Sequence, residues 1–451
     1  MGGTLQIHGE QNRLPWTRLA ETLEKSTSGT QLNVQLVDDV SSWRVGDKVV
    51  ITSTDFDHNQ AEVFEISAVR GNVVDLTGAV RFTHFGEVWE TIDMRAEVGL
   101  LSRNIKISGD IETGKEPCLG ELSDCLDAED DFDFFGGHIM AIEGFKSYSI
   151  RGAELYHMGQ AEVLGRYPIH FHMAHDTSRG GVPSIISDNS IHDTFSRCIT
   201  VHGSHNVELR NNVAFNHFGH CFFLEDGGEK NTVIIGNLGL GTKKGELTPG
   251  DMRPTTFWIT SPLTTLKDNV AAGSDNEKGF GIWFLFPDEP VGPSKGLGFL
   301  GLFEAKYTPI TAFDNNVAHS NGETGFGLFR RLGENHEVVG CSTYSPRVDP
   351  YDTKSDLAQV ALTNFVGYKN RKRNVRCRSR AAVMRNFKLA DSRVGIEFER
   401  NMFGGYQRVV DAVIAGETPN IGNDFKVRVD GVMRTMDRSY PEKVVSGASK
   451  R

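Results

Sequence analysis

The sequence has little that would indicate a helical, membrane-spanning or nucleic-acid-binding protein. No run approaches 18 consecutive apolar residues, so an apolar transmembrane helix is not expected. The 48 Lys and Arg residues are outnumbered by 59 Asp and Glu residues, and the formal net charge is -11. That balance argues against a generally basic surface that would neutralise a nucleic acid backbone. We therefore expect no nucleic-acid partner and no membrane span in this chain.

Cysteine and targeting signals are also scarce. The six cysteines form no CxxC pair and are too few for a disulfide scaffold. Cys118 and Cys125 lie close together in a Gly/Asp-rich loop, where a local bridge stays an open question. Cys198 and Cys221 lie within apolar strands and are interpreted as small core residues. The first twenty residues lack the apolar centre of a signal peptide, so we expect no export signal there.

Helical periodicity is scarce, and short β-branched and aromatic runs separated by Gly, Asn and Asp dominate the chain. Several such runs between residues 30 and 110 predict a small N-terminal β module, which we assign to residues 1–110. Residues 111–137 are rich in acidic residues and glycine and are interpreted as a loop into a second region. We assign residues 111–451 to that second domain.

The second domain contains an internal repeat. The segment FSRCITVHG at 195–203 aligns with FGHCFFLED at 218–226, an offset of 23 residues. Asparagine followed closely by an apolar residue recurs at Asn189, Asn212, Asn237, Asn269, Asn316 and Asn386. Repeats of this length that are rich in strands and turns predict a right-handed parallel β-helix, in which equivalent residues stack about 4.8 Å apart. Larger gaps near 287–293 and 342–350 predict insertions between coils.

The β-helix prediction converts the alignment into geometry, because alternate residues of a strand face opposite sides. In the stretch Ile169 to His172, both histidines are expected to point outward. One outer ladder then contains His172, His202 and Glu225, and a parallel ladder contains Arg197 and His220. Trp258 and Trp283 are expected to extend the same face with flat aromatic surfaces. The sequence therefore predicts a groove with acid/base groups in its middle and stacking platforms along it.

Histidine is concentrated on this part of the chain, with 10 of the 15 histidines between residues 138 and 220. Two imidazoles from one strand and a third from the next coil, His170, His172 and His202, match a site for a divalent metal with an open position. Zinc or another transition metal is expected, and calcium stays possible because carboxylates are nearby. A histidine cluster that acts only in acid/base chemistry fits the same residues.

Other polar residues on the predicted face are candidates for catalysis and substrate binding. Glu225 and Asp226 end an apolar strand, where they either serve as acid/base groups or cap a turn. Planar guanidinium groups match a substrate carboxylate. We assign catalytic roles to Glu225, Asp226, His202, His220, Arg197 and His192, and substrate binding to Arg166, Asp176, Trp258 and Trp283. A basic cluster either grips a polyanion or is a solvated loop edge: Arg371, Lys372, Arg373, Arg376, Arg378 and Arg380.

Several long motifs resemble one known family. They are STDFDHNQAEVFEI (53–66), DMRAEVGLLSRNI (93–105), the turn at 136–139, YPIHFH (167–172), HDTFSRCITVHGS (192–204), GHCFFLEDG (219–227) and NNVAHSN (315–321). Together they are similar to the family of the cell surface hyaluronidase and the cell migration-inducing hyaluronan-binding protein, from about residue 30 to 330. The resemblance implies a right-handed β-helix with an N-terminal β module, an extracellular setting, and binding and depolymerisation of hyaluronan.

The leading functional hypothesis is an endo-acting glycoside hydrolase on hyaluronan or a similar uronate-containing glycan. Glu225 or Asp226 would be the general acid, and a metal ion, His202 or His220 would support the attacking water. A second hypothesis is a metal-assisted polysaccharide lyase, in which a cation or Arg197 neutralises the uronate carboxylate. A third is a glycan-binding β-helix without turnover, which would use Trp258 and Trp283 for stacking.

Overall fold

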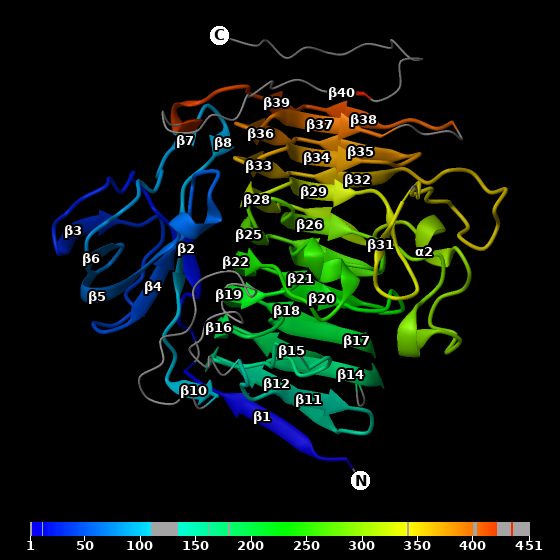
Figure 1. The fold of residues 1–451 in the computed structure, drawn as a ribbon, viewed down its shortest axis with the longest axis horizontal. Helices are drawn as coiled ribbons and strands as arrows, with labels where there is room; N and C mark the ends of the chain where they lie inside the picture. The colour runs from blue at the N-terminus through cyan, green and yellow to red at the C-terminus, as the bar shows by residue number, and fades with distance from the viewer. Residues whose placement is uncertain are drawn as a thin grey trace.

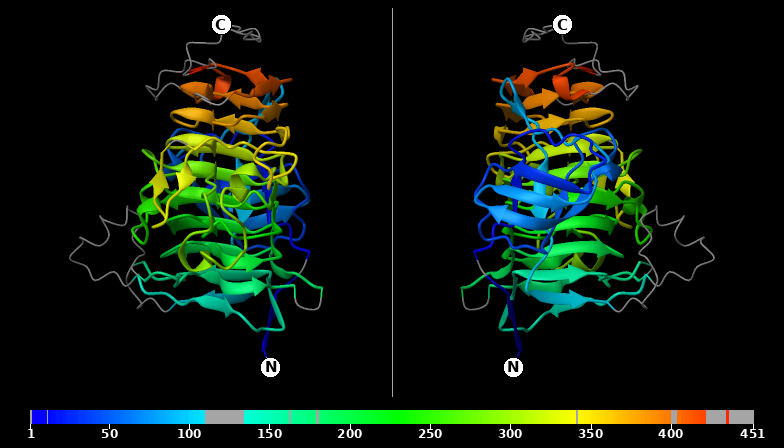
Figure 2. Two further views of the ribbon diagram at one scale, coloured as in Figure 1. Left: turned by 90° about the vertical axis from the view of Figure 1, so that its right-hand side faces the viewer. Right: turned by 90° about the vertical axis from the view of Figure 1, so that its left-hand side faces the viewer.

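The computed structural model describes residues 2–10, 12–109, 134–161, 163–178, 181–340, 342–399, 404–421 and 434–435. Three parallel sheets of ten strands each dominate this part of the chain. Figures 1 and 2 show their strands stacked coil upon coil, from β1 at one end to β38–β40 at the other. Each coil contributes one strand to each sheet, so the predicted all-β fold, a parallel β-helix preceded by a small β module, is confirmed.

The strands of the three long sheets have the following bounds. The first sheet contains β1 (Thr4–His8), β12 (Ser147–Arg151), β15 (Ser184–Ser187), β18 (Val207–Arg210), β21 (Thr232–Ile235), β24 (Thr264–Lys267), β27 (Ala312–Asp314), β32 (Val360–Thr363), β35 (Ala382–Arg385) and β38 (Arg408–Val410). The second contains β10 (Ile105–Ser108), β13 (Ala153–Tyr156), β16 (Ser190–Thr194), β19 (Val213–Phe218), β22 (Leu238–Lys243), β25 (Val270–Ser274), β28 (Val317–Asn321), β33 (Val366–Tyr368), β36 (Lys388–Ala390) and β39 (Val413–Ile414). The third contains β11 (Ile139–Ile142), β14 (Ile169–Asp176), β17 (Ile199–His205), β20 (Phe222–Leu224), β23 (Thr255–Ile259), β26 (Phe280–Phe284), β29 (Thr324–Leu328), β34 (Arg373–Cys377), β37 (Val394–Phe398) and β40 (Arg434–Thr435).

The recurring asparagines explain how the coils turn between the first and second sheets. Asn189, Asn212, Asn237, Asn269 and Asn316 are fully buried and stacked. Each of the first four donates its side-chain amide to the next asparagine oxygen at 2.9–3.1 Å. Asn386 does not belong to this ladder. It is exposed, has a positive φ of 53° and occupies the preceding turn position, while Phe365 and Phe387 are at the ladder position instead, with ring centroids 5.4 Å apart.

The N-terminal module is a six-stranded antiparallel sheet that lies against one flank of the β-helix (Figure 1). Its strands, in sheet order, are β2 (Trp16–Arg18), β9 (Glu97–Leu100), β4 (Lys48–Ile51), β5 (Glu62–Arg70), β6 (Val73–Thr77) and β3 (Thr30–Gln35). Two short strands, β7 (Val88–Trp89) and β8 (Ile92–Asp93), form a separate pair. The predicted boundary at residue 110 stays a prediction, but β1 and β10 pair with β12 and β13 in the long sheets.

The module and the β-helix share a hydrophobic core. Val50, Met94 and Leu101 of the module pack in one buried cluster with Leu238 and Val270 of the second sheet. A separate cluster fills the interior of the β-helix along its length. A third lies inside the module itself. The shared cluster holds the module in a fixed position beside the coils, because burying apolar area is the main favourable contribution to packing.

Cys198 and Cys221 are both buried, as predicted for core residues, but they are also joined by a disulfide. The two residues occupy equivalent positions in neighbouring coils, 23 residues apart. The one-coil offset brings their Cα atoms to 4.6 Å, which lies in the range that a disulfide needs. The pair therefore links two successive coils directly beside Arg197 and His220. Cys118 and Cys125 lie outside the described residues.

Two insertions interrupt the coils on the flank opposite the N-terminal module (Figure 1). The first insertion, residues 287–311, follows β26 and contains η3 (Gly292–Ser294) and α2 (Glu304–Tyr307). The second follows β29 and begins with a hairpin, residues 331–339, formed by β30 (Arg331–Leu332) and β31 (Val338–Val339). The remaining short helices are η1 (His58–Gln60), η2 (Pro249–Met252) and η4 (Pro419–Ile421). Among the described residues, no helix has the length and apolar character needed to cross a membrane.

Candidate functional site

The outer face of the third sheet carries the predicted ladder. His172 on β14 lies beside His202 on β17, in register. Val201 pairs with Leu224 in the next coil. Glu225, which follows Leu224, is therefore beside His202, which follows Val201, in the same ladder. Ile169 and Phe171 point into the core, whereas the histidines between and after them point outward, as the strand alternation predicts.

The three predicted metal ligands converge. One ring nitrogen from each of His170, His172 and His202 lies within 4.8 Å of the other two. The rings of His170 and His202 are stacked, with centroids 5.9 Å apart, and the His172 ring is 5.0 Å from each. Burial lowers the pKa of His170 to about 3, so this imidazole is neutral. Neutral imidazole is the form that binds a metal ion.

His202 lies between two carboxylates. Its Nε2 is 2.8 Å from Oδ2 of Asp226, and its Nδ1 is 3.5 Å from Oε2 of Glu225. Burial alone would lower the pKa of His202, but the neighbouring carboxylates outweigh it and raise the pKa to about 9. The two carboxylates differ in their partners. Oε2 of Glu225 is buried and has no hydrogen-bond partner, whereas Asp226 is surrounded by donors.

Two donors to Asp226 come from the insertions. The backbone N–H of Ser294, in the first insertion, donates to Oδ2 at 3.0 Å. Nε2 of His336, in the hairpin, lies 2.9 Å from Oδ1. Burial would raise the pKa of Asp226, but the hydrogen bonds from His202, His336 and Ser294 hold it well below its usual range. Asp226 is therefore an ionised carboxylate with little freedom to move.

Gly292 allows the first insertion to come this close. Its φ is +53°, in the left-handed region, and a Cβ there would lie 2.9 Å from Oδ1 of Asp226. Ion pairs join the two insertions to each other: Lys295 Nζ lies 2.8 Å from Glu334, and Arg331 lies 3.2 Å from Asp288. Sequence reasoning missed His336 and Ser294. Neither insertion follows the coil repeat, so the repeat cannot predict which residues the insertions contact.

Glu229 is a further carboxylate that sequence reasoning missed. It is fully buried, and it accepts the backbone N–H groups of Gly203, Asp226 and Gly227 at 2.9–3.2 Å. Burial and the nearby Asp226 carboxylate raise the pKa of Glu229 to about 7. Its position three residues after Asp226, in the turn after β20, is the signal that could have identified it. Its contacts show that it fixes the backbone of the Glu225–Gly227 turn.

Arg197 and His220 lie side by side as predicted, but neither reaches solvent. Arg197 is fully buried, with Nη1 2.6 Å from Oδ1 of Asp251, and its guanidinium lies 4.0 Å from the centre of the Phe223 ring. His220 is also fully buried and stacks on Trp258, with centroids 4.0 Å apart. The ion pair between Arg197 and Asp251, in η2 before β23, argues against the expectation that Arg197 meets a substrate carboxylate.

The predicted stacking platforms are wrong in one respect. Trp258 and Trp283 are on the outer face of the sheet, in register with each other, but they are 1% and 0% exposed. They pack with Phe329, Leu332 and Val291, which come from the chain around the two insertions. The sequence correctly predicted the outward direction of the two indoles but could not show that the insertions cover them.

The remaining predicted residues lie at different depths. His192 is mostly buried and ion-paired, with Nδ1 2.7 Å from Asp193 and Nε2 3.5 Å from Glu154. Arg166 is exposed, and its Nη1 is 2.9 Å from the ring of His138 on the coil below. Asp176 is exposed and accepts hydrogen bonds from Ser178 and Asn206. The guanidinium of Arg166 thus faces solvent. Among the described contacts it is not paired with a carboxylate.

The basic cluster at 371–380 is largely neutralised by acidic residues in neighbouring coils. Lys372 and Arg373 approach Glu323, and Arg376 pairs with both Glu397 and Glu399. Alternating cations and carboxylates on stacked coils stabilise the ladder electrostatically. This arrangement favours the structural interpretation of the cluster over a polyanion grip.

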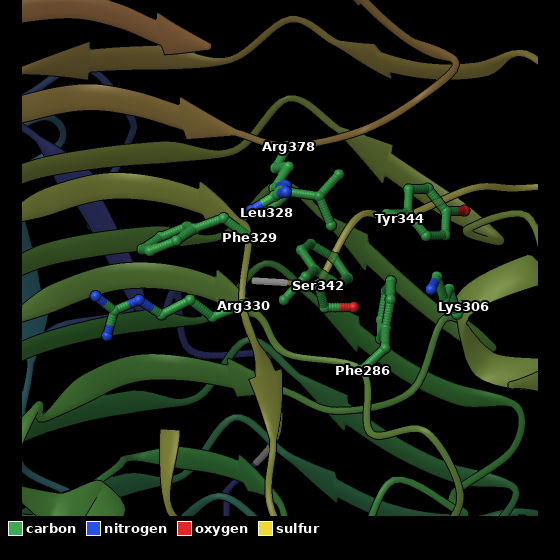
Figure 3. Close-up of a pocket in the computed structure, with 9 residues that line it drawn as sticks. Phe286, Lys306, Leu328, Phe329, Arg330, Ser342, Tyr344 and Arg378 are labelled. Carbon is green, nitrogen blue, oxygen red and sulfur yellow. The ribbon is translucent and has the colours of Figure 1, made fainter. Parts of the chain in front are cut away.

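A separate pocket is lined by residues of both insertions and of the third sheet. Figure 3 shows it between Phe286, Ser342 and Tyr344, with Lys306 and Arg378 at its edge. Arg378 donates to the hydroxyl of Thr343 at 2.9 Å and approaches Glu399 at 3.7 Å. None of the residues that line this pocket is a carboxylate or a histidine. The chemistry of the described residues is therefore concentrated at His172, His202 and Glu225, not here.

Comparison with known proteins agrees with the resemblance seen in the motifs. Residues 134–326 match the family model of the CEMIP beta-helix. The human cell surface hyaluronidase CEMIP2 is 36% identical over 439 residues, which cover 87% of this chain and 31% of the relative. The human cell migration-inducing and hyaluronan-binding protein is 35% identical over 453 residues, which cover 90% of this chain and 32% of the relative.

The chain therefore spans about a third of the length of these two relatives. Among solved structures, the catalytic unit of a GH87 α-1,3-glucanase from Streptomyces thermodiastaticus strain HF3-3 covers 88% of this chain and 87% of its own, at 10% identity. Its TM-score is 0.32, which is too low to support an inference. The sequence matches carry the relationship: this chain resembles the cell surface hyaluronidase family, and residues 134–326 contain that family's β-helix.

Proposed function

We propose that this protein, whose β-helix resembles that of the cell surface hyaluronidase family, is an endo-acting glycoside hydrolase on hyaluronan or a similar uronate-containing glycan. One observation carries the proposal: the buried Oε2 of Glu225, which has no hydrogen-bond partner, lies 3.5 Å from Nδ1 of His202 in the histidine cluster. An extracellular setting is part of the proposal, because the relatives are named as cell surface and hyaluronan-binding proteins.

The two carboxylates of the site take different roles. Asp226 is ionised and held by three donors, so it has no proton to give and positions His202. Glu225 retains a free oxygen, and we assign to it the transfer of a proton to or from the reacting oxygen. Two groups are needed in glycoside hydrolysis, one for the leaving oxygen and one for the water. In the site without a metal ion, His202, 3.5 Å from Glu225, is the second.

Substrate would enter over the coils below the site. Ile142, on the coil before His172, is 61% exposed, and Arg166 presents its guanidinium to solvent nearby in the same coil as His172. An exposed guanidinium matches a uronate carboxylate. On the other side of the site the insertions cover Trp258 and Trp283, which removes the exposed aromatic surface that a purely glycan-binding β-helix would use.

The donor set also fits a divalent cation. Three imidazoles, from His170, His172 and His202, would hold it, and when bound it would supply a Lewis acid that lowers the pKa of a coordinated water. Glu225 lies next to this donor set, because its Oε2 is 3.5 Å from Nδ1 of His202. His170 is neutral without any ion, so this ligand requires no proton loss.

The test is depolymerisation of hyaluronan and a panel of uronate polymers, with chain length and ultraviolet absorbance of the products measured together. Hydrolysis shortens the chains without new absorbance, whereas a lyase produces unsaturated, absorbing ends. Glu225→Gln should lower kcat by about 10²–10⁴-fold, the usual contribution of an acid/base group. Glu208→Gln, on the first sheet, is the matched control and should leave kcat unchanged. Binding without any shortening of the tested polymers would contradict the proposal.

A further inference from the structure

Three histidines, one acidic side chain and two insertions meet around one small space. The buried nitrogens Nε2 of His170 and Nδ1 of His172 have no hydrogen-bond partner. Leaving a buried polar atom without a partner costs about 1–3 kcal/mol, so two such atoms aimed into one cluster need an explanation. Both residues belong to the group in which one ring nitrogen from each histidine lies within 4.8 Å of the other two, so a cation bound there would provide that explanation.

Two of these rings have their other nitrogen hydrogen-bonded to a protein oxygen. Nδ1 of His170 is 2.8 Å from the carbonyl oxygen of Gly165, an acceptor that requires the ring proton on Nδ1 and leaves Nε2 with a free lone pair. Nε2 of His202 is 2.8 Å from Oδ2 of Asp226, so Nδ1 is the nitrogen at which an ion would bind, in place of a proton. Metal-binding histidines characteristically donate their other N–H to a carbonyl or a carboxylate, which sets the tautomer and the ring orientation.

The carboxylate that orients His202 is itself held from outside the coils. Asp226 receives the backbone N–H of Ser294 and contacts the ring of His336, one from each insertion. The His336 side chain is 17% exposed, so this contact lies at the outer edge of the site. The ion pair between Lys295 and Glu334 connects the same two segments at 2.8 Å.

We propose that His170, His172 and His202 form a centre for a first-row transition-metal dication, and that Asp226, held by His336 and Ser294, orients the ligand His202. A catalytic use of the metal centre rests on the proposed function, whereas metal binding itself does not. Three imidazole nitrogens favour a transition metal over calcium, which prefers six to eight oxygen ligands. His336 is thus a positioning residue: it acts on the metal through Asp226 and His202, and the insertions contribute to metal affinity without supplying a ligand.

The test is metal binding by the full chain without any glycan. Protein freed of metal with a chelator is titrated with Co²⁺ alone and with Zn²⁺ alone, and bound metal is measured by calorimetry and by Co²⁺ visible absorption. We expect one ion per chain. His172→Ala should abolish the site, whereas His175→Asn, which changes a half-exposed histidine of the same strand, should retain it. Asparagine suits position 175, where φ is 55°.

His336→Asn separately tests the contact between His336 and Asp226. Its φ of 59° is compatible with asparagine, so the hairpin should keep its conformation while the contact with Asp226 is lost. Metal affinity should fall about 10–100-fold with an unchanged circular dichroism spectrum, as for other outer-shell partners of metal ligands. Unchanged affinity would refute the positioning role of His336. Stoichiometric metal in His172→Ala, or binding of Ca²⁺ in preference to Co²⁺ and Zn²⁺, would refute the centre.

The two proposals fail in distinguishable ways. Glycan shortening by protein that binds no Co²⁺ or Zn²⁺ would remove the metal centre and leave the hydrolase proposal intact. One bound ion that depends on His172, without shortening of any uronate polymer, would establish the centre and contradict the proposed function instead.

Discussion

At the scale of single residues, the partners of a side chain decide its chemistry more than its type does. Glu225 and Asp226 are adjacent in the chain, yet one has a free oxygen and the other is held by three donors. His170 and His202 stack on each other, but burial lowers the pKa of His170 to about 3, whereas carboxylates raise that of His202 to about 9. A histidine or a carboxylate in the sequence therefore names a candidate without naming its role.

The two arginines predicted to bind substrate give a direct test of this difference. Arg197→Met should destabilise the protein by about 3–5 kcal/mol, because it leaves the buried carboxylate of Asp251 without its partner. Arg166→Met should change the free energy of unfolding by less than about 0.5 kcal/mol, as is usual for exposed positions. Urea unfolding at pH 7 measures both.

The same variants separate structure from binding. On a uronate polymer, Arg166→Met is expected to raise KM with little effect on kcat, since the guanidinium contributes to binding and not to proton transfer. If Arg197→Met were as stable as the parent protein, the buried ion pair would not have the structural role assigned to it. Equal KM values for Arg166→Met and the parent would remove Arg166 from the substrate site.

At the scale of elements, each coil depends on the one beneath it. The buried asparagine ladder satisfies backbone and side-chain groups at the turn between the first and second sheets. Asn212, for example, donates to the carbonyl of Ile186 at 3.0 Å and to Asn237 at 2.9 Å. The disulfide between Cys198 and Cys221 links neighbouring coils covalently in the same region of the chain. Equivalent positions thus contact each other even where strands are short.

Asn212→Ala should lower the free energy of unfolding by about 2–4 kcal/mol, because buried partners in the coils on both sides lose their hydrogen bonds. Asn211→Gly is the matched control. Asn211 is exposed and has a φ of 54°, a conformation that glycine adopts without strain, so little change is expected. Urea unfolding followed by circular dichroism compares the two, and equal stabilities would contradict a structural role for the ladder.

At the scale of the whole molecule, the N-terminal module is joined to the β-helix by charge as well as by apolar packing. Glu97 of β9 is buried, and its Oε2 lies 3.0 Å from Nε2 of His319 on β28, 222 residues later. Burial would raise the pKa of Glu97, but His319 and Arg18 outweigh it and lower the pKa to about 2. The ionised carboxylate therefore favours the assembled molecule.

This pair predicts acid sensitivity of the assembly. The pKa of Glu97 is about 2 in the folded protein, compared with an ordinary value of 4.5. The carboxylate therefore contributes to the free energy of unfolding above about pH 4.5, and this contribution is lost as the pH falls toward 2. The contribution is about 2–4 kcal/mol. Glu97→Gln should therefore be less stable at pH 7 and show a shallower loss of stability between pH 5 and pH 2. The exposed Glu246→Gln should retain the parent slope in urea unfolding across that range.

The sequence by itself determined the coil architecture and which residues stack on one another in neighbouring coils. The 23-residue offset places Glu225 beside His202, and strand alternation in the stretch Ile169–His172 adds His172 to the same outer ladder, because stacking in a parallel β-helix follows the coils. Only the tertiary structure decided what covers that ladder. Ser294 and His336 reach Asp226 from 68 and 110 residues away, and the chain around the same insertions buries Trp258 and Trp283. Insertions have no period, so their contacts depend on long-range packing that no local pattern encodes.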